Sequence, residues 1–286
     1  MNLRAAIAQI DCTVGDLREN VDRHLEFINR AIRQKAKLIL FPELSLTGYT
    51  LRDLAWEVAI DPLRNPLLRK LLRKSNQISI ACGCVENGEN HAMYNSALFL
   101  EDGRIRHTHR KLYLPTYGMF EEGRYFSRGR SLRSFDSKHG RFGMLICEDV
   151  WHMSVPYALT MDGAEALLCL TASPTRIAGD KEGLATAQVN HEHHRTYARL
   201  LGTYFLFSNR VGFEDGVNFW GGSSVTDPSG ESLTVAKTFE EDLLIAELSS
   251  ENVRRARRLS RHVLDEDPAL LLRALQRIVE MREQRG

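Results

Sequence analysis

A strand, a helix and a second strand follow one another at the start of the chain, and this order restricts the fold more than any other feature. Residues 4–10 read RAAIAQI and residues 37–41 read KLILF, two apolar runs of strand length. Between them, residues 16–34 carry apolar side chains three or four positions apart, the spacing of an amphipathic helix. Two strands joined through a helix favour a right-handed crossover in a parallel or mixed sheet. We therefore expect an α/β fold.

The same alternation continues along the chain. Further strands are expected at residues 78–85, 95–101, 104–107, 142–146, 164–170, 203–208 and 243–248, and further helices at 65–76, 156–163, 181–201 and 268–284. Asp102-Gly103, between two strand-like runs, indicates a tight two-residue hairpin. Because no linker or repeat interrupts the pattern, we predict one α/β domain over residues 1–250.

Residues 251–286 begin with a basic stretch that contains RRARRLSR and are predicted to form a helical arm. The arm is interpreted as a solvated or subunit-packing helix. A nucleic-acid partner is not expected, because the arm lacks interleaved aromatic residues and a supporting module. The formal net charge of +1 agrees with this, since it implies no bulk polyanion as partner.

Targeting signals and cysteine usage favour a cytoplasmic protein. The first residues lack the long apolar core of a signal peptide, and no stretch approaches the roughly 18 apolar residues of a membrane helix. The chain has 5 cysteines, an odd number, and most of them lie inside apolar runs. This pattern indicates reduced thiols rather than a disulfide framework. No membrane partner is expected.

The stretch FGMLICEDVW, residues 142–151, is the first candidate for chemistry. It reads as a buried strand that ends in Cys147 and is followed directly by Glu148 and Asp149. Alpha/beta folds carry their chemistry at the carboxyl ends of strands, which makes Cys147 a candidate nucleophile. The alternative is a small buried core residue, which is what most free cysteines are.

Two charged residues occupy comparable positions elsewhere. Glu43 follows the second expected strand within FPE, where the alternative is a glutamate at a helix N-terminus or in a solvated loop. Lys111 lies where another strand runs into HRKLYLP. The next loop, residues 116–130, is rich in aromatic and charged side chains and is typical of a binding loop on a rigid scaffold. The alternative for this loop is a partly ordered surface segment.

A metal site is not expected. Cys82 and Cys84 form a C-x-C pair, but no second pair completes a ligand set. The sequence HEHHR, residues 191–195, lacks the second histidine that H-E-x-x-H requires. We interpret these histidines as a polar helix face.

Three motifs resemble the nitrilase superfamily of carbon–nitrogen hydrolases: FPE at 41–43, HRKLYLP at 109–115 and ICEDVW at 146–151. Longer segments, among them FPELSLTGY, LPTYGMFEEGRYF and DGVNFWGGSSVTDPSG, are similar to the glutamine-hydrolysing domain of glutamine-dependent NAD synthetases, over roughly residues 3–250. The resemblance implies an αββα four-layer sandwich that is usually dimeric, so a homodimer or higher homo-oligomer is expected. The SGG-x-D-S loop of the synthetase domain does not occur, so no ATP, NAD or other cofactor is expected here.

The resemblance also implies roles for named residues. Cys147 would be the nucleophile, Glu43 the general base and Lys111 the cation that stabilises the tetrahedral oxyanion. An amide carbonyl needs these three functions, so the residue types suit the chemistry. Glu122 matches a second glutamate of the family that positions substrate and lysine, and Glu121 ranks below it.

Substrate-binding residues follow from the same resemblance. Tyr49 and Tyr117 match positions that line the glutamine site, and Ser173 matches a position that contacts the amino-acid end of the substrate. The backbone amide of Glu148 is the expected second donor to the oxyanion. The chain departs from this branch at Cys169, where an asparagine is usual.

The expected function is hydrolysis of a small ω-amide, with glutamine the first candidate, to a carboxylate and ammonia through a cysteine thioester. The same triad also serves hydrolysis of an N-carbamoyl compound or a nitrile, and these remain alternatives. A further alternative is a subunit that delivers ammonia to a separate NAD synthetase.

Overall fold

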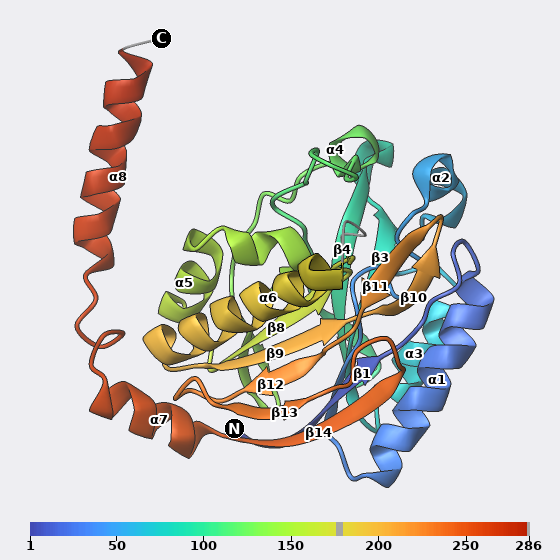
Figure 1. Ribbon diagram of the computed structural model, residues 1–286, viewed down its shortest axis with the longest axis horizontal. Helices are drawn as coiled ribbons and strands as arrows, with labels where there is room; N and C mark the ends of the chain where they lie inside the picture. Colours follow the sequence, from blue (N-terminus) through green and yellow to red (C-terminus); the bar gives the residue numbers. More distant parts are fainter. Residues whose placement is uncertain (176–179, 285–286) are drawn as a thin grey trace.

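The computed structural model describes residues 1–175 and 180–284, in which two six-stranded sheets face one another between helices (Figure 1). The first sheet has the order β14 (Asp242–Ser249), β1 (Asn2–Gln9), β2 (Leu38–Leu40), β3 (Ser79–Asn87), β4 (Met93–Glu101) and β5 (Arg104–Arg110). The second has the order β13 (Ser232–Val235), β12 (Ser224–Thr226), β9 (Tyr204–Asn209), β8 (Ala166–Thr171), β7 (Gly140–Ile146) and β6 (Phe135–Ser137). A separate hairpin pairs β10 (Val211–Glu214) with β11 (Val217–Trp220).

The helices include long ones that cover the sheets, short ones in the connections and two that form the C-terminal arm. The α-helices are α1 (Leu17–Arg33), α2 (Ala55–Val58), α3 (Leu68–Lys74), α4 (Glu122–Tyr125), α5 (Ser154–Met161), α6 (Asp180–Leu201), α7 (Ser250–Leu259) and α8 (Pro268–Glu283). The described residues also form three short 3₁₀ helices, η1 (Arg52–Leu54), η2 (Glu89–His91) and η3 (Cys147–Trp151). No helix among the described residues combines the length and the apolar character needed to cross a membrane.

The opening strand–helix–strand unit forms as predicted. Strands β1 and β2 are parallel neighbours, with Ala5 opposite Leu38, and α1 connects them. Helix α1 begins after Asp16, whose carboxylate accepts a hydrogen bond from the Glu19 amide at 2.9 Å. This N-cap satisfies one of the free amides at the helix start.

Alternation along β1 assigns its side chains to two different layers. Leu3, Ala5 and Ile7 belong to the apolar core between the two sheets, whereas Ala6 and Ala8 belong to the core beneath α1 and α3. Successive side chains of a strand point to opposite faces, so a strand covered on both sides is apolar throughout. This explains why apolar and polar residues do not alternate along β1.

The second sheet is built in the same way, and together the two sheets give four layers. Met144 and Ile146 of β7 face the first sheet, while Leu145 packs outward with Leu159 of α5. Helices α1 and α3 cover the outer face of the first sheet, and α5 and α6 that of the second (Figure 1). The αββα sandwich is therefore confirmed.

Two local predictions have different outcomes. Asp102 and Gly103 both have positive φ, 50° and 72°, and join β4 to β5, so the hairpin is confirmed. The polar face assigned to the histidines of α6 is wrong in part. His194 is buried and its ring stacks on Phe205, with ring centroids 4.4 Å apart, because this side of α6 faces the second sheet.

The C-terminal arm is attached to the body through α7. Val253 is buried, and Arg257 donates hydrogen bonds to the carbonyl oxygens of Gly202 at 3.1 Å and Ala164 at 2.8 Å. Helix α8 projects away from the sandwich, and none of its residues is buried (Figure 1). The division of the chain at residue 250 stays a prediction.

Candidate active site

Glu43, Lys111 and Cys147 each follow the end of a strand, and the fold brings these ends together. Glu43 comes three residues after β2, Lys111 directly after β5 and Cys147 directly after β7. The first two strands belong to one sheet and the third to the other, so the cluster joins both halves of the sandwich. The Glu43 and Lys111 side chains are fully buried, and Cys147 is partly accessible.

The segment that carries Glu43 lies directly on the neighbouring strand β3. The Phe41 amide donates to the Ala81 carbonyl at 2.8 Å, and the Leu46 amide donates to the Gly83 carbonyl at 2.9 Å. A Cβ atom at Gly83 would lie 2.3 Å from the Leu44 nitrogen, closer than any side chain permits. Glycine at this position lets the Glu43 segment approach the sheet.

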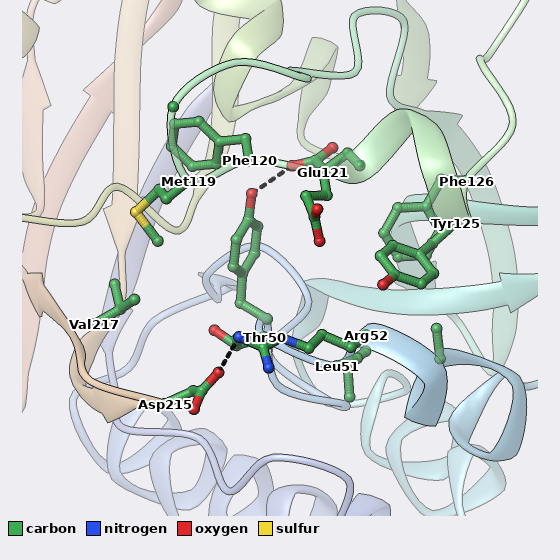
Figure 2. Close-up of a pocket in the computed structure, with 14 residues that line it drawn as sticks. Thr50, Leu51, Arg52, Met119, Phe120, Glu121, Tyr125, Phe126, Asp215 and Val217 are labelled. Carbon is green, nitrogen blue, oxygen red and sulfur yellow. Dashed lines mark hydrogen bonds and ion pairs between the residues drawn. The ribbon is translucent and has the colours of Figure 1, made fainter.

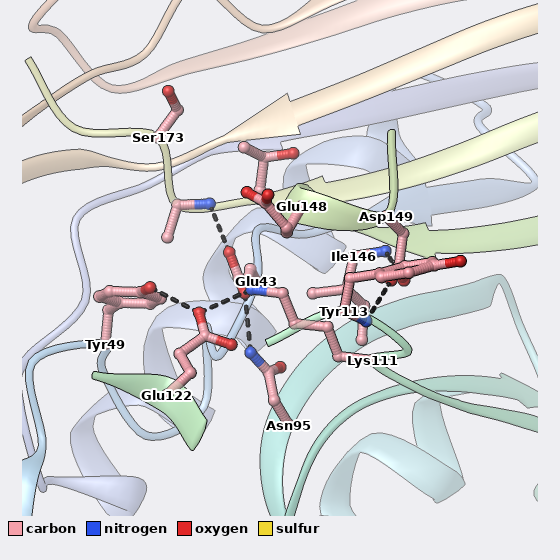
Figure 3. Close-up of polar contacts among 12 residues, drawn as sticks. Glu43, Tyr49, Asn95, Lys111, Tyr113, Glu122, Ile146, Glu148, Asp149 and Ser173 are labelled. Carbon is pink, nitrogen blue, oxygen red and sulfur yellow. Dashed lines mark hydrogen bonds and ion pairs between the residues drawn. The ribbon is translucent and has the colours of Figure 1, made fainter. Parts of the chain in front are cut away.

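Lys111 is held between two carboxylates. Its Nζ lies 2.7 Å from Oε1 of Glu43 and 2.6 Å from Oε1 of Glu122. Figure 3 shows Glu122 between Lys111 and Tyr49, whose hydroxyl donates to the same Oε1 of Glu122 at 2.6 Å. The predicted Glu43, Lys111, Glu122 and Tyr49 therefore form one hydrogen-bonded group.

Glu43 is oriented by two further donors (Figure 3). Asn95 Nδ2 donates to Oε1 of Glu43 at 2.7 Å, and the Ala172 amide donates to Oε2 at 2.9 Å. Oε1 thus accepts from both Lys111 and Asn95, and Oε2 accepts from Ala172. A carboxylate oxygen has two acceptor positions, so Oε2 keeps capacity for one more proton donor.

Burial and charge act in opposite directions on this group. Burial alone would lower the pKa of Lys111, but the carboxylates of Glu122 and Glu43 outweigh it and raise the pKa well above its ordinary value. Lys111 is therefore an ammonium ion. Burial raises the pKa of Glu122 to about 7, with Glu43 acting in the same direction and Lys111 against it. Desolvation of the buried Glu122 carboxyl group is thus the main cause of its higher proton affinity, and the negative charge of Glu43 adds to it.

Cys147 lies at a sharp change of direction between β7 and η3. Its φ is 43°, in the left-handed region that residues other than glycine rarely adopt. Burial, and next the carboxylate of Glu43, raise the pKa of the Cys147 thiol well above its ordinary value, while Lys111 opposes them. The resting group is therefore a neutral thiol, which needs a base to become a nucleophile.

Tyr49 is positioned by a buried ion pair between Glu214, the last residue of β10, and Arg210, which precedes this strand. The Glu214 carboxylate accepts the Tyr49 amide at 3.0 Å and the Thr50 amide at 2.7 Å. Arg210 pairs with Glu214, and its guanidinium lies over the Phe219 ring, 4.5 Å from the centroid. Both charged side chains are about 1% exposed, so the buried Glu214 carboxylate depends on Arg210 for its counter-charge.

Replacing Arg210 with methionine is expected to lower the free energy of unfolding by about 3–5 kcal/mol, because the Glu214 charge is then buried without a partner. Chemical denaturation measures the change. Arg52→Met is the control, since the Arg52–Asp215 pair is exposed and contributes at most about 1 kcal/mol. Equal losses in the two variants would contradict this account of the buried pair.

A cavity of about 510 Å³ opens over Cys147. Tyr117, Glu148 and Ser173, all predicted to bind substrate, line it. The Tyr117 hydroxyl donates to the Glu148 carboxylate at 2.9 Å, and the Ser173 hydroxyl accepts from the Trp220 indole at 3.0 Å. We call this cavity the Cys147 pocket.

A second cavity of about 380 Å³ lies beside the first and shares Gly118, Met119, Phe120 and Val217 with it. Tyr49 and Glu122 line this one, so the predicted residues divide between two adjoining cavities. Figure 2 shows Met119 and Phe120 on one side of the second cavity, opposite Tyr125 and Phe126. The loop of residues 118–120 forms the wall between the cavities.

Some residues of the site were not predicted from the sequence. Asn95 opens the strand-like run NSALFLE, and nothing in that run signals contact with Glu43. Asp149 was noted only as a neighbour of Cys147, although it is fully buried and bound by four donors. Cys169 is not among the residues that line the Cys147 pocket, because its side chain packs in the outer core with α5 and α6.

A metal site in the described part of the chain would need His, Cys, Asp or Glu side chains that converge on one point. In that part of the chain no group of three or more His, Cys, Asp or Glu side chains is arranged to hold a metal ion. Glu43, Lys111, Glu122 and Tyr49 instead form hydrogen bonds with one another.

The family profile of the carbon-nitrogen hydrolases matches residues 4–258. The chain belongs to the carbon-nitrogen hydrolase family. A glutamine-dependent NAD(+) synthetase of Acinetobacter baylyi is 32% identical over 260 residues, which are 88% of this chain and 45% of that protein. This carbon-nitrogen hydrolase thus spans less than half the length of that relative.

Solved structures agree with this assignment. The glutamine-dependent NAD+ synthetase of Acinetobacter baumannii superposes with a TM-score of 0.78 at 31% identity, over 88% of this chain and 47% of that one. A carbon-nitrogen hydrolase of Helicobacter pylori G27 superposes with a TM-score of 0.83 at 22% identity, over 94% and 96% of the two chains. The second likeness shows the shared fold, and the first shows the same fold within a longer protein.

Proposed function

We propose that this carbon-nitrogen hydrolase cleaves the carboxamide of a small ω-amide to a carboxylate and ammonia, with glutamine as the first candidate. The observation that carries the proposal is the buried, hydrogen-bonded cluster of Glu43, Lys111 and Glu122. The charges of all three side chains act electrostatically on the neighbouring Cys147 thiol. Similarity to glutamine-dependent NAD synthetases supports an ω-amide as the substrate class.

The first half of the proposed reaction forms a thioester. Cys147 Sγ attacks the amide carbonyl while its proton passes to Oε2 of Glu43, the oxygen with acceptor capacity to spare. The negative charge that develops on the carbonyl oxygen is stabilised by the Lys111 ammonium and the Glu148 backbone amide. The C–N bond then breaks, Glu43 returns the proton to the leaving nitrogen, and ammonia departs.

The second half hydrolyses the thioester. Glu43 takes a proton from a water molecule, and the resulting hydroxide attacks the same carbonyl. Lys111 again stabilises the oxyanion. The C–S bond breaks, the proton on Glu43 returns to the sulfur, and the carboxylic acid leaves. No metal or organic cofactor enters either half.

Lys111 suits this role because of its remaining donor. An ammonium group has three N–H bonds, and two of them are directed to Glu43 and Glu122. The third remains for the substrate oxygen. Glu122, itself held by Tyr49, keeps the ammonium in place and keeps it protonated. We therefore assign Glu122 and Tyr49 to the positioning of Lys111.

The charge of the Cys147 pocket supports a substrate with an amino group. Glu148 is the acidic side chain among its lining residues, and the Tyr117 hydroxyl orients its carboxylate. A carboxylate at this place pairs favourably with the α-ammonium group of an amino acid. Ser173, whose hydroxyl is held by Trp220, presents a further polar contact after the end of the neighbouring parallel strand β8.

We expect kcat/KM for glutamine to exceed that for butyramide by at least about tenfold, because butyramide lacks the groups that Glu148 and Ser173 would bind. Ammonia release is measured from glutamine, asparagine, butyramide, an N-carbamoyl amine and a nitrile, with a chelator present and without ATP or NAD. Glu148→Gln should weaken glutamine hydrolysis and leave butyramide hydrolysis unchanged. Equal values for glutamine and butyramide would point to a general aliphatic amidase.

A second candidate function is delivery of ammonia to a separate synthetase. The observation that favours it is that the matched relative is a synthetase of which this chain spans 45%. If it is correct, glutamine hydrolysis by the isolated chain is slow and accelerates when an ammonia-dependent NAD synthetase and its substrates are added. A rate that such an addition does not change favours the freestanding amidase.

A further inference from the structure

One buried carboxylate gathers donors from both sides of the active site. Asp149 is fully buried, two residues after Cys147. Its Oδ1 accepts the backbone amides of Leu112 at 3.0 Å and Tyr113 at 3.2 Å. Its Oδ2 accepts the amide of Ile146 at 3.0 Å and His109 Nε2 at 2.8 Å. Figure 3 shows Asp149 beside Ile146 and Tyr113.

These donors flank the two residues on which the proposed function depends. Leu112 and Tyr113 follow Lys111 directly, and His109 precedes it by two positions. Ile146 immediately precedes Cys147. Because Lys111 extends from the first sheet and Cys147 from the second, a single carboxylate ties together the strand ends that carry them.

We propose that Asp149 is a positioning residue, which fixes the backbone of Lys111 relative to that of Cys147 and so sets the distance between ammonium and thiol. The inference rests on the proposed function for its catalytic consequence. Among the described residues, Asp149 forms no hydrogen bond with Glu43, Lys111 or Glu122, and it does not line the Cys147 pocket. It therefore acts through the backbone.

The backbone of Cys147 gives an independent reason for such a clamp. A residue with a side chain at φ of 43° is strained, and such strain persists only where the surroundings over-determine the conformation. The hydrogen bond from the Ile146 amide to Asp149 spans this turn and closes it. Without the clamp, we expect the turn to relax and the Cys147 thiol to move relative to Glu43 and Lys111.

A matched control is available elsewhere in the fold. Glu101 is also buried, and it accepts the Ser79 hydroxyl at 2.9 Å, the Ser137 hydroxyl at 2.7 Å and the Lys138 amide at 3.2 Å. It lies at the far end of β4 and lines neither cavity of the site. Glu101→Gln therefore removes a buried carboxylate of similar bonding without touching the active site.

The test compares Asp149→Asn with Glu101→Gln. Both variants should be less stable than the wild type, because an amide nitrogen replaces an acceptor. In Asp149→Asn, kcat for glutamine should fall by at least about 100-fold, while KM stays within about threefold of the wild-type value. This pattern indicates that the reacting groups have lost their orientation and that substrate binding is retained. Glu101→Gln, assayed at a temperature where it is equally folded, should keep kcat within about threefold.

Alkylation of Cys147 by iodoacetamide tests the clamp without reference to turnover. Asp149→Asn should slow this reaction by at least about tenfold, and Glu101→Gln should not change it. Failure of the wild type to hydrolyse any amide would overturn the proposed function, while the alkylation rates would still decide the role of Asp149. The positioning role would be overturned if Asp149→Asn kept the kcat and the alkylation rate of the wild type. It would also be overturned if Asp149→Asn and Glu101→Gln lost activity and alkylation rate equally.

If Asp149→Asn does not fold, variants of His109 test the positioning role instead. His109→Leu removes one of the four donors and should lower kcat by about tenfold with KM unchanged. His109→Gln restores a donor and should recover kcat to within about threefold of the wild type. Equal activity of the leucine and glutamine variants would contradict the proposal.

Discussion

Replacing Cys147 with alanine is expected to abolish ammonia release and to leave the fold intact. The proposed reaction passes through a bond to this sulfur, so no other side chain can substitute for it. The loss of folding energy is small because Cys147 is partly accessible at a strand end. Single-turnover and steady-state ammonia assays measure the loss, and circular dichroism and thermal unfolding monitor the fold.

The control for this variant is another cysteine of the same chain. Cys82 is fully buried beneath the helices of the first sheet, so Cys82→Ala should keep kcat even where it costs some stability. Mass spectrometry after treatment with iodoacetamide should find the adduct on Cys147, because the other four cysteines are buried. Retained turnover in Cys147→Ala would remove the proposed mechanism altogether.

Glu43→Gln and Lys111→Met are each expected to lower kcat by at least about 10³-fold, since groups that act as a unit are each nearly indispensable. The first change removes the proton acceptor, and the second removes the cation at the oxyanion. Lys111→Arg should fail as well, because a planar guanidinium cannot take the place of a compact ammonium between Glu43 and Glu122. Steady-state kinetics with the best amide of the panel provide the measurement.

Arg110→Met is the matched control for the lysine variants. Arg110 is the neighbour of Lys111, but it pairs with Glu86 on the outer side of the first sheet, at 2.6 Å and partly exposed. Its loss should leave kcat within about threefold. A Lys111→Arg enzyme that works at the wild-type rate would show that Lys111 acts only as a distant charge. In that case the oxyanion must be stabilised by backbone donors alone.

Much of the fold could be predicted because its determinants are local. Each buried strand is a short apolar run, and α1 repeats its apolar residues with the period of a helix. The strand-end positions of Glu43, Lys111 and Cys147 could therefore be read directly. Strands such as β6 and β13 were missed, because three or four residues with mixed polarity carry no clear period.

The histidines of α6 show the limit of local reading. The sequence HEHHR looks polar, and a polar face was the natural interpretation. His194 is nevertheless in the core and stacks on Phe205, and burial lowers its pKa well below the ordinary value, so it is neutral. A neutral imidazole ring can pack as an aromatic side chain does. Whether His194 does so depends on how α6 lies against the second sheet, which the local sequence does not show.

The sequence by itself determined the fold class, the strand ends and the types of residue placed there, because a helix or strand period and a motif are each contained in a short segment. Tertiary structure alone decided which groups meet. Glu43 receives an amide hydrogen bond from Ala172, 129 positions later, and Asp149 binds Leu112, 37 positions earlier. Such contacts depend on how two separate sheets pack against each other, and that packing is the sum of many side chains. No local pattern encodes which distant backbone amide will face a given carboxylate.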